Sequence, residues 1–140
     1  MITIKSPLPS VQDITELLRF LPLLHAEGFK PVKRWGGGEK LEDGAITMPW
    51  PEYDEAVVDF FRLAGQAVWS DYKYRPEEAG KMLADHDVMR SAPIEQIRTM
   101  LTYCVRGERF CDGHWSAMIE QGHLRRLLER LDELSNNSNA

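Results

Sequence analysis

The sequence predicts an all-α fold: a compact single-domain bundle of five or six helices with one long loop that contains tryptophan, glycine and proline. Apolar residues recur at helical spacing along most of the chain, and no pair of alternating apolar runs indicates a sheet. The chain has 140 residues, of which 43% are hydrophobic and 28% are charged. These values are typical of one globular domain whose core needs neither disulfides nor metal.

The first helix is expected to begin after Ser10, whose hydroxyl suits the N-cap position. Asp13, three residues later, is favourable at the positive end of a helix. Pro22 is expected to interrupt the last turns because it lacks an N–H group and crowds the preceding turn, and Gly28 is expected to end the element. The buried face is predicted to consist of Val11, Ile14, Leu17, Leu18, Leu21 and Leu24.

The long loop covers residues 31–51, where the helical pattern breaks. A loop of this length without structure of its own is uncommon in a compact domain, so we expect short extended pieces, for example over residues 45–48. Trp35 and Trp50 are expected to anchor the loop on one end of the core. The three glycines 36–38 lack the flanking residues of a phosphate-binding loop and are expected to form a flexible joint.

The longest helix is expected over residues 51–70. Pro51 suits the first helical position, and the acidic residues Glu52, Asp54 and Glu55 suit the first turn. The apolar stripe of this helix is predicted to consist of Val57, Phe60, Phe61, Ala64 and Val68.

Four further helices complete the predicted bundle. A short helix is expected over residues 76–84, and a longer one follows Pro93 and ends near Val105. Another short helix is expected to begin with Asp112 as its cap. The last helix, up to Leu134, carries its leucines on one face.

The predicted domain spans residues 1–134, and the polar residues 135–140 are expected to form a disordered tail. The N-terminus lacks the pattern of a signal peptide, and no apolar run approaches the roughly 18 residues of a membrane-spanning helix. The chain has two cysteines. Together these features predict a cytoplasmic protein with free thiols and no membrane contact.

The charge of the chain is acidic and unevenly distributed. Its 17 basic and 22 acidic residues give a net charge of −5, which argues against a protein that coats nucleic acid. Residues 39–87 carry twelve acidic and five basic residues, whereas all seven bases of residues 88–130 are arginine.

Residues 98–115 hold the densest set of chemically active side chains. A zinc site would use Cys104, Cys111, His114 and His123. Six residues lie between the two cysteines instead of the two to four that are usual in structural zinc sites, and Cys104 falls on an apolar stripe. The sequence therefore predicts no metal site and no cofactor.

An anion site is the second interpretation of this segment. Arg106 and Arg109, together with backbone N–H groups at the start of the following helix, would suit a phosphate or carboxylate. Asp112 as the cap would compete for those N–H groups, and Glu108 would pair with either arginine. The candidate ligand-binding residues are Arg106, Arg109, His114, Trp115 and Tyr103.

A catalytic site is the third interpretation, with His114 as a base and Cys111 or Tyr103 as its partner. No motif of an activated nucleophile supports it, so we assign no catalytic residue. A helix-turn-helix DNA-binding protein is a weaker alternative. The joint between the two helices has about seven residues where that motif has three or four, and the second helix lacks a cluster of side chains that read bases.

Four runs of residues resemble an uncharacterised family of small prokaryotic proteins that share a domain of unknown function. The runs are Trp69-Ser70-Asp71-Tyr72, residues 97–103, residues 107–115 and Ile119-Glu120-x-Gly122. The most specific part is an Arg-Phe-x-Asp-Gly-x-Trp motif, here Arg109 to Trp115. The resemblance implies a mostly helical cytosolic domain and assigns no activity, cofactor or site residue.

The sequence as a whole favours a small cytosolic protein-interaction or regulatory module without catalytic activity, whose partner is another protein and not nucleic acid. The alternative is a small-molecule or anion-binding protein, or an enzyme, that uses the turn from Arg106 to Trp115. In the first case the polar cluster in this turn braces a corner of the fold, and in the second its side chains converge on one pocket.

Overall fold

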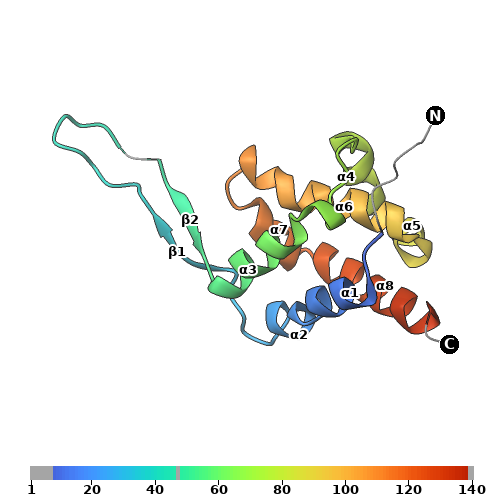
Figure 1. The fold of residues 1–140 in the computed structure, drawn as a ribbon. Helices are drawn as coiled ribbons and strands as arrows, with labels where there is room; N and C mark the ends of the chain where they lie inside the picture. Colours follow the sequence, from blue (N-terminus) through green and yellow to red (C-terminus); the bar gives the residue numbers. More distant parts are fainter. Residues whose placement is uncertain (1–7, 47, 139–140) are drawn as a thin grey trace.

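Helix α8 is the element around which the other helices pack (Figure 1). The computed structural model describes residues 8–46 and 48–138. In this part of the chain helices predominate and the only sheet has two strands, so the predicted all-α class is confirmed. The helices that contact α8 (His123–Ser138) are α1 (Val11–Leu18), α2 (Phe20–Leu24), α5 (His86–Ser91), α6 (Ile94–Arg106) and α7 (His114–Glu120).

The remaining elements connect these helices and carry the hairpin. They are β1 (Val32–Gly36), β2 (Trp50–Tyr53), α3 (Glu55–Ala64), the 3₁₀ helix η1 (Ala67–Trp69), α4 (Pro76–Ala84) and the 3₁₀ helix η2 (Gly107–Arg109).

The start of the first helix agrees with the prediction, and its end does not. Ser10 and Asp13 form a reciprocal capping box at the start of α1. The helix breaks between α1 and α2, and the break lies where the missing N–H group of Pro22 would have met the carbonyl of Leu18. α2 ends at Leu24, before the predicted end at Gly28.

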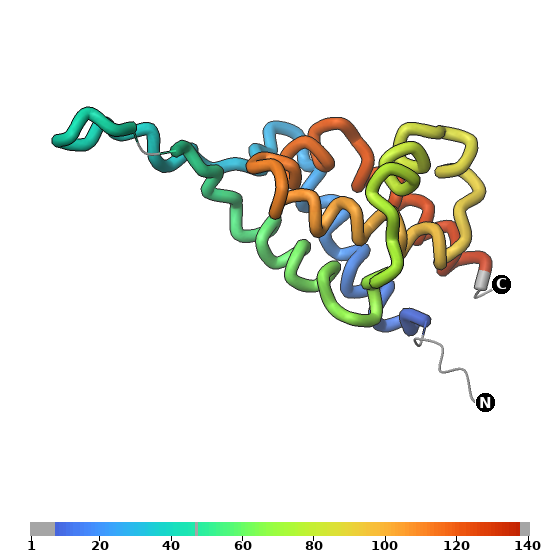
Figure 2. Tube along the Cα trace, turned by 90° about the horizontal axis from the view of Figure 1, so that it is seen from above, coloured from blue at the N-terminus to red at the C-terminus, as the bar shows by residue number. Residues whose placement is uncertain are grey.

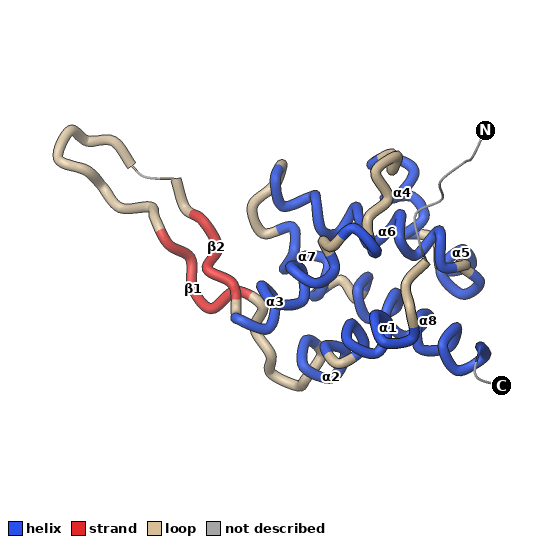
Figure 3. The backbone as a smooth tube through the Cα atoms, viewed as in Figure 1, coloured by secondary structure: helices blue, strands red, loops and turns tan. Residues whose placement is uncertain are grey.

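Residues 32–53 form a two-stranded antiparallel hairpin, which we call the hairpin arm (Figure 3). Beyond the two strands, Lys40 and Ile46 form an isolated bridge, and residue 47 of the predicted extended piece lies outside the described residues. The sequence did not predict this sheet. Neither face of the arm is buried, so no selection for alternating apolar residues marks its strands.

The arm projects away from the helices instead of lying over one end of the core (Figure 2). The prediction that Trp35 and Trp50 anchor this segment on the core is therefore wrong: both side chains are exposed, and it is Tyr53 that packs against the buried cluster. The C-terminal end of α8 lies on the opposite side of the bundle (Figure 1).

Helix α3 is shorter than the predicted helix over residues 51–70. It begins at Glu55 because Pro51 belongs to β2 and Asp54 is the N-cap, accepting a hydrogen bond from the backbone N–H of Ala56 at 2.9 Å. It ends at Ala64, and η1 follows as a separate turn. The longest described helix is α8, with 16 residues.

Helix α8 also corrects the prediction of a tail over residues 135–140. The helix continues through Ser138, and residues 139–140 lie outside the described part. Once the leucine-rich turns are formed, each added residue gains a hydrogen bond without a new nucleation cost, so the polar sequence after Leu134 extends the helix. None of the described helices combines the length and the apolar character needed to cross a membrane.

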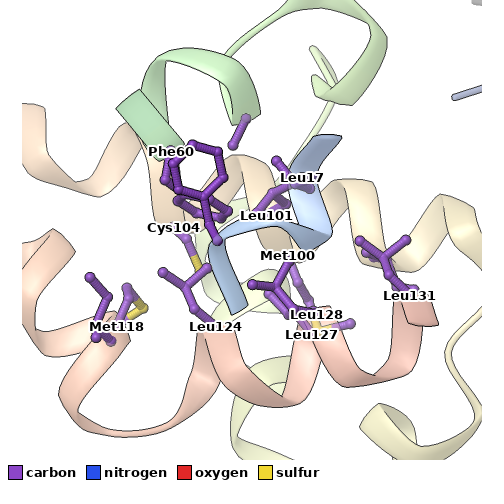
Figure 4. Close-up of a cluster of buried hydrophobic side chains, with 14 of the residues drawn as sticks. Leu17, Phe60, Met100, Leu101, Cys104, Met118, Leu124, Leu127, Leu128 and Leu131 are labelled. Carbon is purple, nitrogen blue, oxygen red and sulfur yellow. The ribbon is translucent and has the colours of Figure 1, made fainter. Parts of the chain in front are cut away.

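The core lies between α1, α3, α6, α7 and α8, and Figure 4 shows the side chains converging from these helices. Phe60 packs edge-on against Phe20 and Phe61, with ring centroids 5.6 and 5.1 Å apart. The fully buried residues include Leu17, Phe60, Met100, Leu101, Cys104, Leu124, Leu127, Leu128 and Leu131.

Phe61→Ala is expected to lower the free energy of unfolding by about 3–5 kcal/mol, because it removes a buried aromatic ring from a close-packed site. Phe61 is 2% exposed. Chemical denaturation measures the change. The matched control is Val58→Ala on the same helix, where the side chain is 36% exposed and the midpoint should move far less. Equal midpoints for the two variants would contradict the assigned core.

Candidate functional site

The carboxylate of Glu108 joins three parts of the chain. One oxygen, Oε2, accepts a hydrogen bond from the backbone N–H of Gly113 at 2.9 Å. The other, Oε1, accepts from the backbone N–H of Trp115 at 2.8 Å and from the hydroxyl of Tyr53 at 2.7 Å. Glu108 lies in η2, so this single side chain fastens the beginning of α7 and the end of β2 to the turn after α6.

The side chain that accepts the N–H groups at the start of α7 is therefore Glu108, and the prediction that Asp112 caps this helix is wrong. α7 begins at His114, its N-cap is Gly113, and Asp112 is exposed. Gly113 has a φ of 89°, a left-handed conformation that favours glycine. A Cβ atom at this position would also lie 3.4 Å from the ring of Trp35, so the arm packs directly on the backbone here.

Trp115 packs into the wall of the core beside this carboxylate. Its ring stacks on Phe61 with centroids 4.5 Å apart and an interplanar angle of 5°. Its Nε1–H donates to the carbonyl of Val105 at 2.9 Å, and its ring lies 5.2 Å from that of Tyr53. Each of these contacts is structural: the indole connects α3, the end of α6 and the base of the arm.

His114 and Tyr103 are brought together, with ring centroids 5.2 Å apart in an edge-to-face arrangement. His114 Nε2 is buried and has no hydrogen-bond partner among the described residues. Burial lowers the pKa of His114, and the backbone of Tyr103 and the charge of Glu108 oppose this effect in part. A neutral imidazole packed on an aromatic ring is what this environment favours.

The two arginines of the proposed anion site lie apart from the start of α7. The guanidinium of Arg106 lies over the rings of Tyr72 and Tyr74, at 5.6 and 5.4 Å from their centroids. Arg109 is exposed. Because Glu108 already occupies the N–H groups that would hold an anion, the geometry does not favour an anion site in this turn.

The four residues of the alternative zinc site are also separated. Cys104 is buried in α6, where burial raises the pKa of its thiol, and Cys111 is exposed. Within the described ranges, no group of three or more histidine, cysteine or acidic side chains could hold a metal ion. His123 instead contacts the Nη2 group of Arg126 through its Nδ1 atom at 2.8 Å.

The hairpin arm carries five of the eleven large apolar side chains that the described residues expose. Their exposed fractions are 55% for Trp35, 47% for Leu41, 68% for Ile46, 81% for Met48 and 49% for Trp50. The turn that holds the arm adds Phe110, which is 83% exposed. Isolated exposed apolar residues are common on proteins, but a concentration of them on one projecting element is typical of an interaction surface.

Two glycines of the arm, Gly36 and Gly37, lie directly against the ring of Trp50. The ring of Trp50 lies so close to Gly36 and Gly37 that Cβ atoms on either residue would overlap it. Gly37 also has a φ of 75°. The bare backbone thus acts as a flat platform for the indole, which holds the ring in place on the arm.

Contacts at the base hold the arm in one orientation. The Tyr53 hydroxyl donates to Glu108, and the ring of Trp35 packs on Gly113. Arg34 pairs with Glu52 across the two strands. Sequence reasoning missed Glu108 and Tyr53 as partners because they are 55 residues apart, and no local pattern marks such a pair.

Glu108→Ala is expected to lower the free energy of unfolding by about 3 kcal/mol, because it leaves two backbone N–H groups and one hydroxyl without their charged acceptor. Thermal and chemical denaturation measure the loss. The matched control is Asp112→Ala, which removes an exposed carboxylate four residues away and should change stability by less than about 0.5 kcal/mol. A larger loss for Asp112→Ala than for Glu108→Ala would mean that the cap is assigned wrongly.

Stability is expected to fall as the pH drops below about 6.5, the ordinary pKa of histidine. Burial lowers the pKa of His114 and, with the charge of Arg126 as a further cause, that of His123. As the pH falls, these histidines therefore take up protons in the unfolded chain at a higher pH than in the folded chain. The free energy of unfolding is highest above the unfolded pKa, and it decreases as the pH falls from there through the folded pKa values.

Thermal unfolding across this pH range tests the prediction. His114→Asn is expected to flatten the pH dependence. The comparison variant is His86→Asn, at an exposed position whose charge is one of the smaller causes of the lowered pKa of His123, and it should flatten the dependence less. An unchanged slope in His114→Asn would show that this imidazole does not contribute.

No curated protein and no solved structure matches the chain. A family model does match, and it covers residues 9–137. Because this match includes the arm, the Glu108 contacts and all the helices of the core, the chain belongs to DUF6508, a family of unknown function.

Proposed function

We propose that this protein is a protein-interaction module without catalytic activity, and that the hairpin arm is its contact surface. The observation that carries the proposal is the set of exposed apolar side chains on a projecting arm. Trp35, Ile46, Met48 and Trp50 are each about half exposed or more. Tryptophan and methionine are enriched in protein interfaces, and tryptophan is among the residues that supply most of the binding energy there.

The faces of the arm are better suited to contact than its edges. β2 contains Pro51, which has no N–H group to offer, and β1 carries the charged side chains of Lys33 and Arg34. Proline and lysine on edge strands discourage the addition of further strands. The proposed contact is therefore made by side chains, with the arm inserted into or against an apolar surface.

A second copy of this chain is the partner that we propose first. Residues 32–53 carry four acidic and three basic side chains, a net charge of −1, whereas the whole chain has a net charge of −5. Two arms can therefore meet with less repulsion than two bundles would experience. A twofold contact needs only one surface, and a two-stranded hairpin gains stability when another element covers it.

The cytoplasm of a prokaryotic cell is the proposed setting. Both cysteines, Cys104 and Cys111, are free thiols in the described part of the chain. Free thiols of this kind are typical of a reducing compartment. The resemblance of the four sequence runs to small prokaryotic proteins supports the same setting.

The double substitution Ile46→Lys and Met48→Lys tests the proposed surface, because it places charge on the most exposed part of the arm without touching its base. We expect the natural protein to dimerise in the micromolar range and the variant to dimerise at least about tenfold more weakly, a loss of 1.4 kcal/mol or more. Sedimentation equilibrium measures both. Val11→Lys is the matched control, since Val11 is 58% exposed on the bundle.

A photoreactive residue at position 48, compared with one at position 11, identifies the partner in the native host. Cross-links between two copies of the chain from position 48 alone support the full proposal. Cross-links from position 48 to one different protein support the interaction surface and overturn the second copy as partner. A monomeric protein without cross-links from the arm would overturn the proposed function.

A further inference from the structure

A hollow of about 570 Å³ lies between the segment after η1 and the first turns of α6. This volume falls within the range of pockets that bind small molecules. The hollow brings together parts of two of the sequence runs noted above, residues 69–72 and 97–103, which no sequence pattern had joined. Its lining includes Ser70, Asp71, Lys73, Glu95, Arg98 and Thr99.

Arg98 is a buried cation that has no anionic partner among the described residues. The side chain is 8% exposed, and it makes one hydrogen bond, from Nη2 to the carbonyl of Ser70 at 3.2 Å. Its Nε atom is buried without a partner, and among the described residues no carboxylate forms an ion pair with it. A buried charge of this kind is costly unless it is compensated, and the planar guanidinium matches a carboxylate with two parallel hydrogen bonds.

Asp71 is a fixed carboxylate in the same hollow. Its Oδ2 atom accepts from the hydroxyl of Thr99 at 2.7 Å, and Oδ1 accepts from the backbone N–H of Lys73 at 3.0 Å. Its own backbone N–H donates to the hydroxyl of Thr102 at 2.9 Å. Each carboxylate oxygen retains a free lone pair, so Asp71 can accept a further hydrogen bond from a ligand.

The charges of the lining determine the class of ligand. Lys73 and Arg98 are cationic, and Asp71 and Glu95 are anionic. The two carboxylates would repel phosphate or another simple anion, and the two cations would repel a simple amine. A molecule with one group of each charge can pair with the buried guanidinium of Arg98 and with the half-buried carboxylate of Asp71 at the same time.

We propose that this hollow binds a small amino-carboxylate, such as a free α-amino acid, with its carboxylate on the guanidinium of Arg98 and its ammonium group on the carboxylate of Asp71. Thr99 is a positioning residue, because its hydroxyl orients Asp71. The site lies in the bundle and does not depend on the arm, so its test is independent of the proposed interaction function.

The test is a titration of the full, ¹⁵N-labelled chain with a panel of L-α-amino acids that have apolar, acidic and basic side chains. Acetate, inorganic phosphate and ethylamine are the single-charge probes. At least one amino acid is expected to shift the amide signals of residues 70–73 and 95–99 saturably. Each single-charge probe is expected to bind at least about tenfold more weakly, since it loses one of the two charge pairs.

Arg98→Met is expected to abolish the shifts, whereas Arg90→Met, which removes an exposed arginine paired with Asp87, is expected to leave them unchanged. If Arg98→Met does not fold, Asp71→Asn supplies the second variant, with an expected loss of at least about tenfold in amino-acid affinity. The proposal is overturned if no amino acid shifts these signals, if acetate binds as tightly as the amino acid, or if a folded Arg98→Met variant binds as the natural protein does.

Discussion

The hydrogen bonds to Glu108 connect the helical bundle to the hairpin arm. One carboxylate satisfies the start of α7 and receives the hydroxyl of Tyr53, so helix capping and arm anchoring depend on the same two oxygen atoms. Because the acceptor is charged and half-buried, these bonds are stronger than bonds between neutral groups. The orientation of the arm is consequently coupled to the stability of the α6–α7 junction.

The helices were predictable from sequence, and the arm was not, for the same physical reason. The apolar stripes that contain Leu17, Phe60 and Leu101 exist because those side chains are buried, and burial produces the helical spacing. The arm buries neither face, so its sequence contains no periodic signal. The ends of the helices were less predictable than their existence. Pro51 suits the first position of a helix, but it pairs with β1 as part of β2, so α3 begins only after its N-cap Asp54.

The candidate site shows the same limit more sharply. The residues singled out in sequence, from Tyr103 to Trp115, do lie close together, but Trp115 packs on Phe61 and Arg106 packs on two tyrosines. Composition and local spacing identify such groups without showing what each faces. Arg98 carried no special mark in the sequence, because its distinguishing property is burial without an ion-pair partner among the described residues, which depends on residues from another part of the chain.

The two free cysteines differ in a way that makes the junction accessible to chemistry. Cys104 is fully buried, while Cys111 is exposed in the turn between η2 and α7, the turn on which the arm rests. A maleimide dye added to the native protein should therefore label a single sulfur atom. Without any engineered residue, a fluorophore at that position would report rotation or displacement of the neighbouring arm.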